Sequence, residues 1–293
     1  MKVLLPIDFS EATENGICAI ERRPWAADTE ITVLYVVDTM RYLSPGVDRS
    51  PYIESQSKAA KDRATEVATR LSSHGLKATG VVRWGYPPAV IINYADKTLG
   101  ADLIVVSSQG RGAVARFLLG SVAKHVLQFA RCSVEIARKL PAKGSAAPMN
   151  ILLATDGSSF SEWAAKSVAQ RPWPKGSVVE VLAVAEATTT APDAWNAAIR
   201  IGEEVQSERL KVANEAVESA EKTFSSTGLS VSSKIVSGNP KSAILDEAKN
   251  LGADLIAVGS HGRQGLRRLL LGGVAEAVAL HSHCLVEVIR ERP

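Results

Sequence analysis

The sequence has few of the features that mark several classes of protein. Its three cysteines, Cys18, Cys132 and Cys284, lack the spacing of metal ligands and form no even framework, so we expect small buried residues in a reducing cytosol. The net charge is only +3, without a dense basic run or interleaved aromatic residues, so nucleic acid is not expected as the main partner. No apolar stretch approaches the roughly 20 residues that span a membrane.

What remains is ordinary globular composition. The 293 residues, 46% hydrophobic and 22% charged, suffice for two domains of roughly 150 residues with a core each. In the N-terminal segment MKVLLPIDFSEA, a short apolar run is ended by Asp8, and no signal-peptide cleavage site follows. We therefore expect a first strand rather than a signal peptide, and a cytoplasmic protein.

The strongest signal is an internal repeat. KVLLPIDFS at 2–10 recurs as NILLATDGS at 150–158, and the tripeptide Arg-Pro-Trp recurs at the same offset of 148. Residues 99–138 and 251–290 then align without a gap, with 21 of 40 positions identical. The period is a whole domain, so the sequence predicts a duplication rather than a solenoid. The predicted domains are 1–140 and 149–293, joined by a linker, 141–148, rich in small residues and proline.

Within each half, apolar runs of strand length alternate with helical segments. Continuous β-branched runs separated by helices predict a parallel sheet covered on both faces. Right-handed crossovers then give a doubly wound α/β domain, whose ligand crevice lies at the carboxyl ends of the strands. In the first half the expected strands are Val3–Ile7, Ile31–Val37, Ala78–Arg83, Leu103–Ser107 and Ser133–Arg138.

Spaced glycines follow the fourth strand of each half. Glycines let the backbone approach a ligand closely, and a helix start favours phosphate, so each segment fits an anion site. A serine at the helix start can cap the helix and offer a hydroxyl, and an arginine in each loop adds positive charge. A glycine-rich connection without a ligand is the alternative, and local spacing does not decide between them. The first loop contains Ser107, Gly110, Arg111, Gly120 and Ser121, and the second Gly259, Gly262, Arg263, Gly272 and Gly273.

One aspartate ends the first strand of each half, Asp8 in the first and Asp156 in the second. Beside the crevice, its carboxylate can accept hydrogen bonds from ribose hydroxyls or an exocyclic amine. The alternative is a helix cap, because Ser159 and Glu162 have the spacing of a capping box. The neighbouring phosphate loop favours ligand binding.

Four features of each half together resemble the universal stress protein family. They are the strand–Asp–x–Ser start, the G-x2-G-x9-G-[ST] loop, the Gly-x-Pro segments at 85–87 and 238–240, and the closing C-x-V-x-hydrophobic strand. The resemblance covers nearly the whole chain, twice. It implies a five-stranded parallel sheet of order 3-2-1-4-5 in each domain, and ATP or another adenine nucleotide in the crevice, often with Mg²⁺ or Mn²⁺. It also implies that Asp8 and Asp156 contact the adenosine, that the backbones of Val36 and Val184 meet the adenine, and that the loops hold the phosphates.

Each half departs from the family pattern once. Ser107 replaces the first glycine, and Gly273 replaces the serine or threonine. A lost hydroxyl costs about 0.5–1.5 kcal/mol, against roughly 8 kcal/mol for micromolar binding. Both sites are therefore expected to bind, with unequal affinity. The resemblance also implies dimerisation through the last strand, so we expect 133–138 and 285–290 to pair antiparallel within the chain; a further homodimer would join two chains.

Catalysis has little support in the sequence. His261 lies between two loop glycines, but the matching residue is Gln109, and no set of nucleophile, base and orienting residue is evident. The sequence favours a regulatory binding module whose ATP hydrolysis, if any, is slow. A nucleotide hydrolase or transferase and a scaffold with vestigial pockets remain as alternatives.

Overall fold

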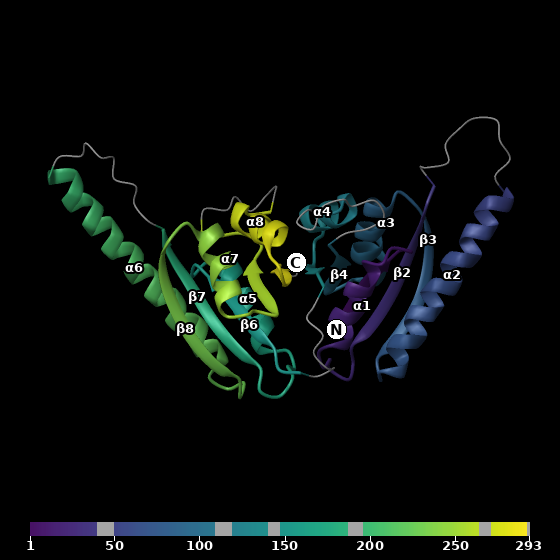
Figure 1. Ribbon diagram of the computed structural model, residues 1–293, viewed down its shortest axis with the longest axis horizontal. Coiled ribbons are helices and arrows are strands. Elements are labelled where there is room, and N and C mark those ends of the chain that lie inside the picture. The colour runs from purple at the N-terminus through teal and green to yellow at the C-terminus, as the bar shows by residue number, and fades with distance from the viewer. Residues whose placement is uncertain (40–49, 109–118, 140–146, 187–195, 264–270, 292–293) are drawn as a thin grey trace. The chain divides into compact units, whose positions relative to one another are not determined.

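The computed structural model describes residues 1–39, 50–108, 119–139, 147–186, 196–263 and 271–291. The chain divides into two compact units, Met1–Ala147 and Pro148–Arg290 (Figure 1), here called the first and second units.

The first unit is a parallel sheet with helices between its strands. The strand order is β3-β2-β1-β4-β5, which confirms the predicted order for this half. Its elements are β1 (Lys2–Ile7), α1 (Thr13–Glu21), β2 (Glu30–Asp38), α2 (Ser50–Ser73), β3 (Lys77–Gly85), α3 (Pro87–Asn93), the π-helical turn η2 (Tyr94–Leu99), β4 (Leu103–Ser107), α4 (Ser121–Phe129) and β5 (Ser133–Ala137).

The second unit repeats this plan. Its strands are again all parallel, in the order β8-β7-β6-β9-β10, equivalent to that of the first unit. Its elements are β6 (Asn150–Thr155), α5 (Ser159–Ala169), β7 (Val178–Glu186), α6 (Asn196–Phe224), β8 (Ser230–Gly238), α7 (Pro240–Asn250), β9 (Leu255–Gly259), α8 (Gly273–His281) and β10 (Leu285–Ile289).

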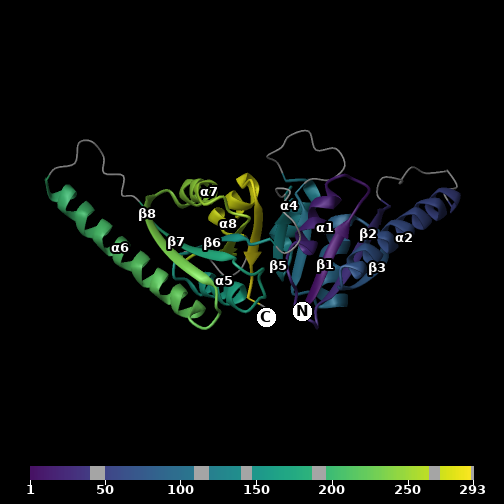
Figure 2. The same cartoon turned by 60° about the horizontal axis from the view of Figure 1, so that its bottom comes forward.

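Helices cover both faces of each sheet (Figures 1 and 2). In the first unit α1 packs beside α2 and α3 beside α4; in the second, α5 packs beside α6 and α7 beside α8. Crossovers from β1 to β3 run one way across the sheet and those from β3 to β5 run back, so right-handed connections place the two pairs on opposite faces. The central strands are therefore covered twice, and Val3, Leu4 and Leu5 of β1 are fully buried.

The repeated Arg-Pro-Trp segment supplies a buried ion pair in each unit. Arg23 lies 2.8 Å from Glu135 of β5, and their side chains are 2% and 0% exposed. Arg171 donates two hydrogen bonds to Glu287 of β10, at 2.5 and 2.6 Å. The tryptophan two residues after each arginine donates its indole N–H to a backbone carbonyl of the preceding helix, at 2.9 and 2.8 Å. The segment thus joins the end of the first helix of each unit to its last strand.

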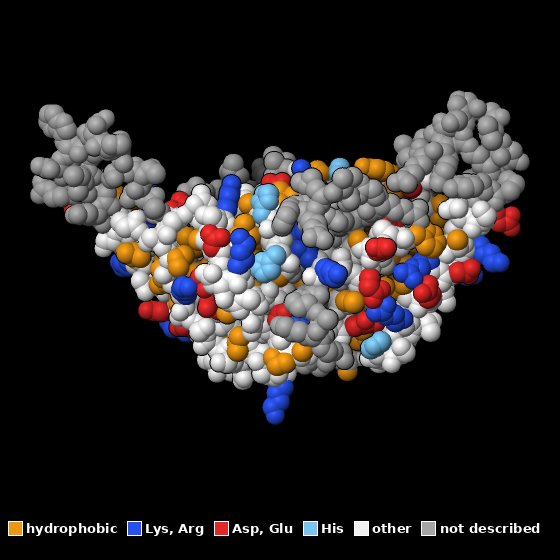
Figure 3. All heavy atoms as spheres, in the orientation of Figure 1, with side chains coloured by type: hydrophobic (Ala, Val, Ile, Leu, Met, Phe, Trp, Pro, Cys, Tyr) orange, Lys and Arg blue, Asp and Glu red, His pale blue; other side chains and the backbone are white. Residues whose placement is uncertain are grey.

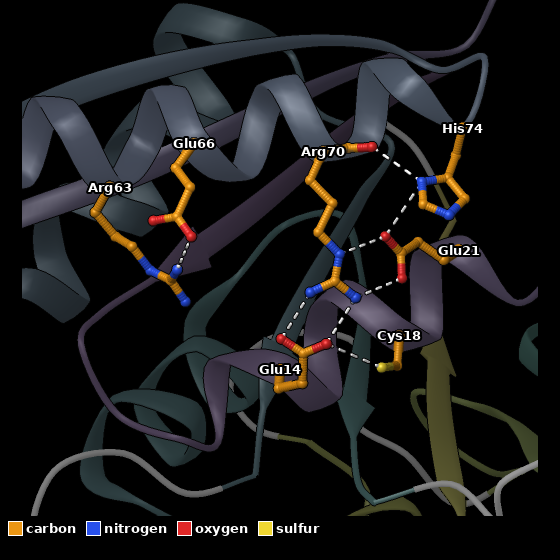
Figure 4. A network of polar contacts seen from close by, with 7 residues as sticks. All are labelled: Glu14, Cys18, Glu21, Arg63, Glu66, Arg70 and His74. Atoms are coloured by element: carbon orange, nitrogen blue, oxygen red, sulfur yellow. Dashed lines mark hydrogen bonds and ion pairs between the residues drawn. The ribbon is translucent and has the colours of Figure 1, made fainter.

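A polar network links α1 to α2 in the first unit (Figure 4). The Arg70 guanidinium of α2 donates to Glu14 at 2.9 Å and to Glu21 at 2.8 and 2.7 Å. His74 Nδ1 lies 3.5 Å from the Glu21 carboxylate. The second unit has no arginine at the position that matches Arg70, so this polar network is specific to the first unit.

The cysteines are less buried than the sequence suggested. Cys284 is buried, but Cys18 and Cys132 are only half-buried, and none of the three forms a disulfide bond. Burial raises the pKa of the Cys18 thiol, and the adjacent Glu14 carboxylate raises it further. Little thiolate forms near neutral pH, which makes Cys18 a poor nucleophile.

No helix in the described part of the chain is long and apolar enough to cross a membrane. Basic and acidic side chains are interspersed over the described residues on the face shown in Figure 3.

Candidate functional site

The two central strands of each unit part at their carboxyl ends. β1 and β4 are paired only as far as Leu4 and Ile104, although the strands continue to Ile7 and Ser107. β6 and β9 likewise stop pairing before either strand ends. Connections leave these neighbouring strands in opposite directions, so each parting lies at a topological switch point, where doubly wound sheets bind ligands.

The outer neighbour of the first strand extends beyond it. β1 ends its pairing with β2 at Ile7 and Tyr35, so Val36 is the first residue of β2 past the end of β1. Val184 holds the same place on β7, past the end of β6. A ligand in the crevice can therefore meet the backbone of either valine from the side that the first strand leaves open.

Asp8 follows β1 and holds the turn that leads to α1. Its Oδ1 accepts hydrogen bonds from the Ser10 amide at 2.8 Å, the Ser10 hydroxyl at 2.5 Å and the Thr13 hydroxyl at 2.9 Å. The residue at the N-cap of α1 is Ala12, so Asp8 does not cap this helix. The printed hydrogen bonds all go to Oδ1, and Oδ2 accepts none from the described residues.

Asp156 connects its turn to the glycine loop of the second unit. Oδ1 accepts from the Ser158 amide at 3.0 Å and the Ser158 hydroxyl at 2.6 Å, while Oδ2 accepts from the Arg263 amide at 2.9 Å. A Cβ on Gly262 would lie 2.8 Å from Oδ2, so any larger residue would have to displace the carboxylate or the loop. The structure thus brings together Asp156, Gly262 and Arg263. A carboxylate has about four acceptor positions, so one remains for a ligand.

The capping box predicted at Ser159 and Glu162 is wrong by one residue. Ser158 is the N-cap of α5, and its hydroxyl accepts from the Ser161 amide at 3.3 Å. The capping serine must keep an extended backbone, and the residues after it are already helical.

Both glycine loops close with the same hydrogen bond. The Gly120 amide donates to the Ser108 carbonyl at 2.8 Å, and the Gly272 amide donates to the Ser260 carbonyl at 2.8 Å. Each glycine is the N-cap of the following helix, without a capping side chain. The prediction that Ser121 caps α4 is therefore wrong, because Ser121 is already the first helical residue. Its exposed hydroxyl remains available to a ligand.

The N-terminal part of each loop packs on the first helix rather than on open crevice. A Cβ on Gly259 would lie 2.7 Å from the carbonyl carbon of Phe160 in α5, so glycine makes room for that helix. In the first unit the Ser107 hydroxyl lies 3.2 Å from where a Cβ on Gly16 of α1 would stand. Ser107 thus turns its side chain toward a glycine of α1, an orientation that the loop pattern alone does not reveal.

Gly259→Ser is expected to destabilise the second unit by about 1–3 kcal/mol, because its side chain overlaps the α5 backbone. Gly273→Ser is the matched control, since a Cβ there meets only a lysine side chain at 3.8 Å. Chemical denaturation of both variants measures the difference. Equal midpoints for the two would contradict this packing role.

Two predicted residues of the first loop, Gly110 and Arg111, lie outside the described residues. His261, between two glycines of the second loop, packs its ring 5.0 Å from that of Phe160 and lies 3.2 Å from the Ser260 hydroxyl. Within the described ranges, no group of three or more acidic, histidine or cysteine side chains is arranged to hold a metal ion.

Two tandem doubly wound units, each with a glycine loop beside the parted central strands, define a duplicated α/β protein with a switch-point crevice in each half. A model of the universal stress protein family matches residues 1–138 and again residues 148–290. The chain belongs to the universal stress protein family.

Similar proteins match this chain either over its whole length or over about one half. A universal stress protein of Mycolicibacterium smegmatis is 26% identical over 99% of this chain and 97% of its own. The crystal structure of a universal stress protein from Archaeoglobus fulgidus has a TM-score of 0.64 at 26% identity, covering 99% of this chain and 96% of that one. A universal stress protein solved in complex with cAMP matches 48% of this chain and 97% of its own, at 23% identity and a TM-score of 0.33.

Proposed function

We propose that the chain is a stress-response regulatory module that binds ATP or a related adenine nucleotide in each of two domains, 1–140 and 149–293, in the cytoplasm. The observation that carries the proposal is the convergence at one switch point of Asp156 with Gly262 and Arg263. Family membership supports it, because the family resemblance implies an adenine nucleotide in this crevice.

The proposed binding mode follows from the chemistry of each group. The aspartates accept hydrogen bonds from the ribose, and the backbones of Val36 and Val184 meet the adenine edge. The amides at the starts of α4 and α8 hold the phosphates with help from the helix dipole. The described side chains do not form a metal cage of their own, so Mg²⁺ or Mn²⁺ would enter with the nucleotide phosphates.

The proposal for assembly follows the sequence prediction. The last strands, β5 and β10, are proposed to pair within the chain, which covers two exposed sheet edges. Any homodimer is a further association of whole chains.

The test is a titration of the purified, nucleotide-stripped chain with ATP, AMP and cAMP, combined with mass spectrometry of whatever co-purifies. We expect micromolar affinity, about 8 kcal/mol, for at least one adenine nucleotide. Millimolar or absent binding of all three, with nothing co-purifying, would leave only the scaffold alternative. Steady-state phosphate release well above about one turnover per minute would favour the enzyme alternative, since typical kcat values are about 1–10³ per second.

A further inference from the structure

One position of the second loop lacks the side chain that the family pattern provides. Gly273, the first residue of α8, stands where the first unit has Ser121. Space does not impose this glycine. A Cβ on Gly273 meets only the Nζ of Lys241 at 3.8 Å and its Cε at 3.9 Å, both ordinary contact distances.

The ammonium of Lys241 therefore stands beside the place of the missing hydroxyl. Lys241 is the second residue of α7, where Pro240 begins the helix and the Asn239 side chain caps it by accepting from the Lys241 amide at 2.9 Å. α7 packs against α8. The backbone that carries this lysine is thus fixed next to the phosphate loop.

This placement brings the positive charge of Lys241 close to the N-terminus of α8. The start of α8 is the positive end of a helix dipole, which disfavours a nearby cation. Among the described residues, nothing pairs with the Lys241 ammonium: Glu276, in the first turn of α8, is not within ion-pair distance. An anion bound between the start of α8 and the lysine would offset the repulsion between these two positive charges.

The two units differ at this position in a compensating way. The residue after the Gly-x-Pro segment is Pro88 in the first unit and Lys241 in the second. At these two positions the first site therefore has a hydroxyl and a proline, and the second has a glycine and a lysine.

We propose that Lys241 replaces the missing hydroxyl of Gly273 as a phosphate ligand of the second site and makes that site selective for the more highly charged adenine nucleotides. This inference rests on the proposed function. A charged donor binds phosphate more strongly than a neutral hydroxyl, so the gain grows with the charge of the ligand.

The experiment uses the full chain with the first site blocked by Gly120→Val, so that only the second site reports. Lys241→Ala is expected to weaken ATP binding about tenfold or more and to change adenosine binding less than twofold. Adding Gly273→Ser to Lys241→Ala should recover part of the loss. Lys249→Ala, at the exposed far end of the same helix, is the matched control and should change neither affinity.

The role of Lys241 and the proposed nucleotide binding fail under different results. Undiminished ATP affinity in Lys241→Ala, or an equal loss for ATP and adenosine, overturns the role of the lysine while the proposed function stands. Failure of the unaltered chain to bind any adenine nucleotide overturns the proposed function, and this inference with it.

Discussion

Replacing Glu287 by alanine is expected to destabilise the second unit by about 3–5 kcal/mol, because it removes the buried carboxylate that accepts two hydrogen bonds from the Arg171 guanidinium. The two side chains are 2% and 14% exposed, and their two short hydrogen bonds leave little room for water to substitute for the carboxylate. Chemical denaturation followed by circular dichroism measures the loss, with the two units fitted as separate transitions.

Two controls distinguish the effect of a buried ion pair from that of any ion pair. Asp246→Ala removes an exposed partner of Lys249, with both side chains about two-thirds exposed, and should change stability by less than about 1 kcal/mol. Replacing Arg171 and Glu287 together by Met and Leu should cost less than Glu287→Ala alone, since no charge is left unpaired. A loss below about 1 kcal/mol for Glu287→Ala would show that the pair does not stabilise the unit.

Gly120→Val is expected to halve nucleotide binding, from two nucleotides per chain to one. Gly120 caps the start of α4, and its amide closes the loop onto the Ser108 carbonyl. A branched side chain there would stand where the proposed binding mode places the phosphates. Loss of the helix-start contacts should weaken that site at least 100-fold, about 2.7 kcal/mol. Calorimetric titration of the full chain gives the stoichiometry directly.

The second site serves as the internal control for this variant. Its affinity should be unchanged, which shows that the chain is folded and that the effect is confined to the first unit. Gly272→Val should produce the reciprocal loss, and the double variant should bind none. If Gly120→Val still binds two nucleotides per chain, the glycine loop is not the phosphate site.

The repeat made much of the fold predictable. Apolar runs such as 103–107 and 255–259 are buried on both faces and tolerate little but a parallel, doubly covered strand. The right-handedness of the crossover connections then limits the possible strand orders. The same alignment showed the loops at matching places and the two departures, Ser107 and Gly273.

Finer roles were not predictable, because they depend on which residues from distant segments meet. The capping-box spacing pointed to Ser159, but the backbone makes Ser158 the cap. The repeated Arg-Pro-Trp gave no hint of its partner, since Glu135 and Glu287 lie more than 100 residues away. The sequence did not predict that Lys241 lies next to Gly273, because only the packing of α7 on α8 brings the two residues together.

The sequence by itself determined the duplication, the α/β class of each half and the location of the glycine loops, because periodicity and glycine spacing are local properties of the chain. The strand order was implied by the resemblance to the universal stress protein family. Only the tertiary structure decided what each loop glycine accommodates: Gly259 makes room for a helix, Gly262 for a carboxylate, and Gly273 stands beside a lysine. These roles follow from close contacts between segments far apart in the chain, and sequence spacing does not encode the distances at which such segments meet.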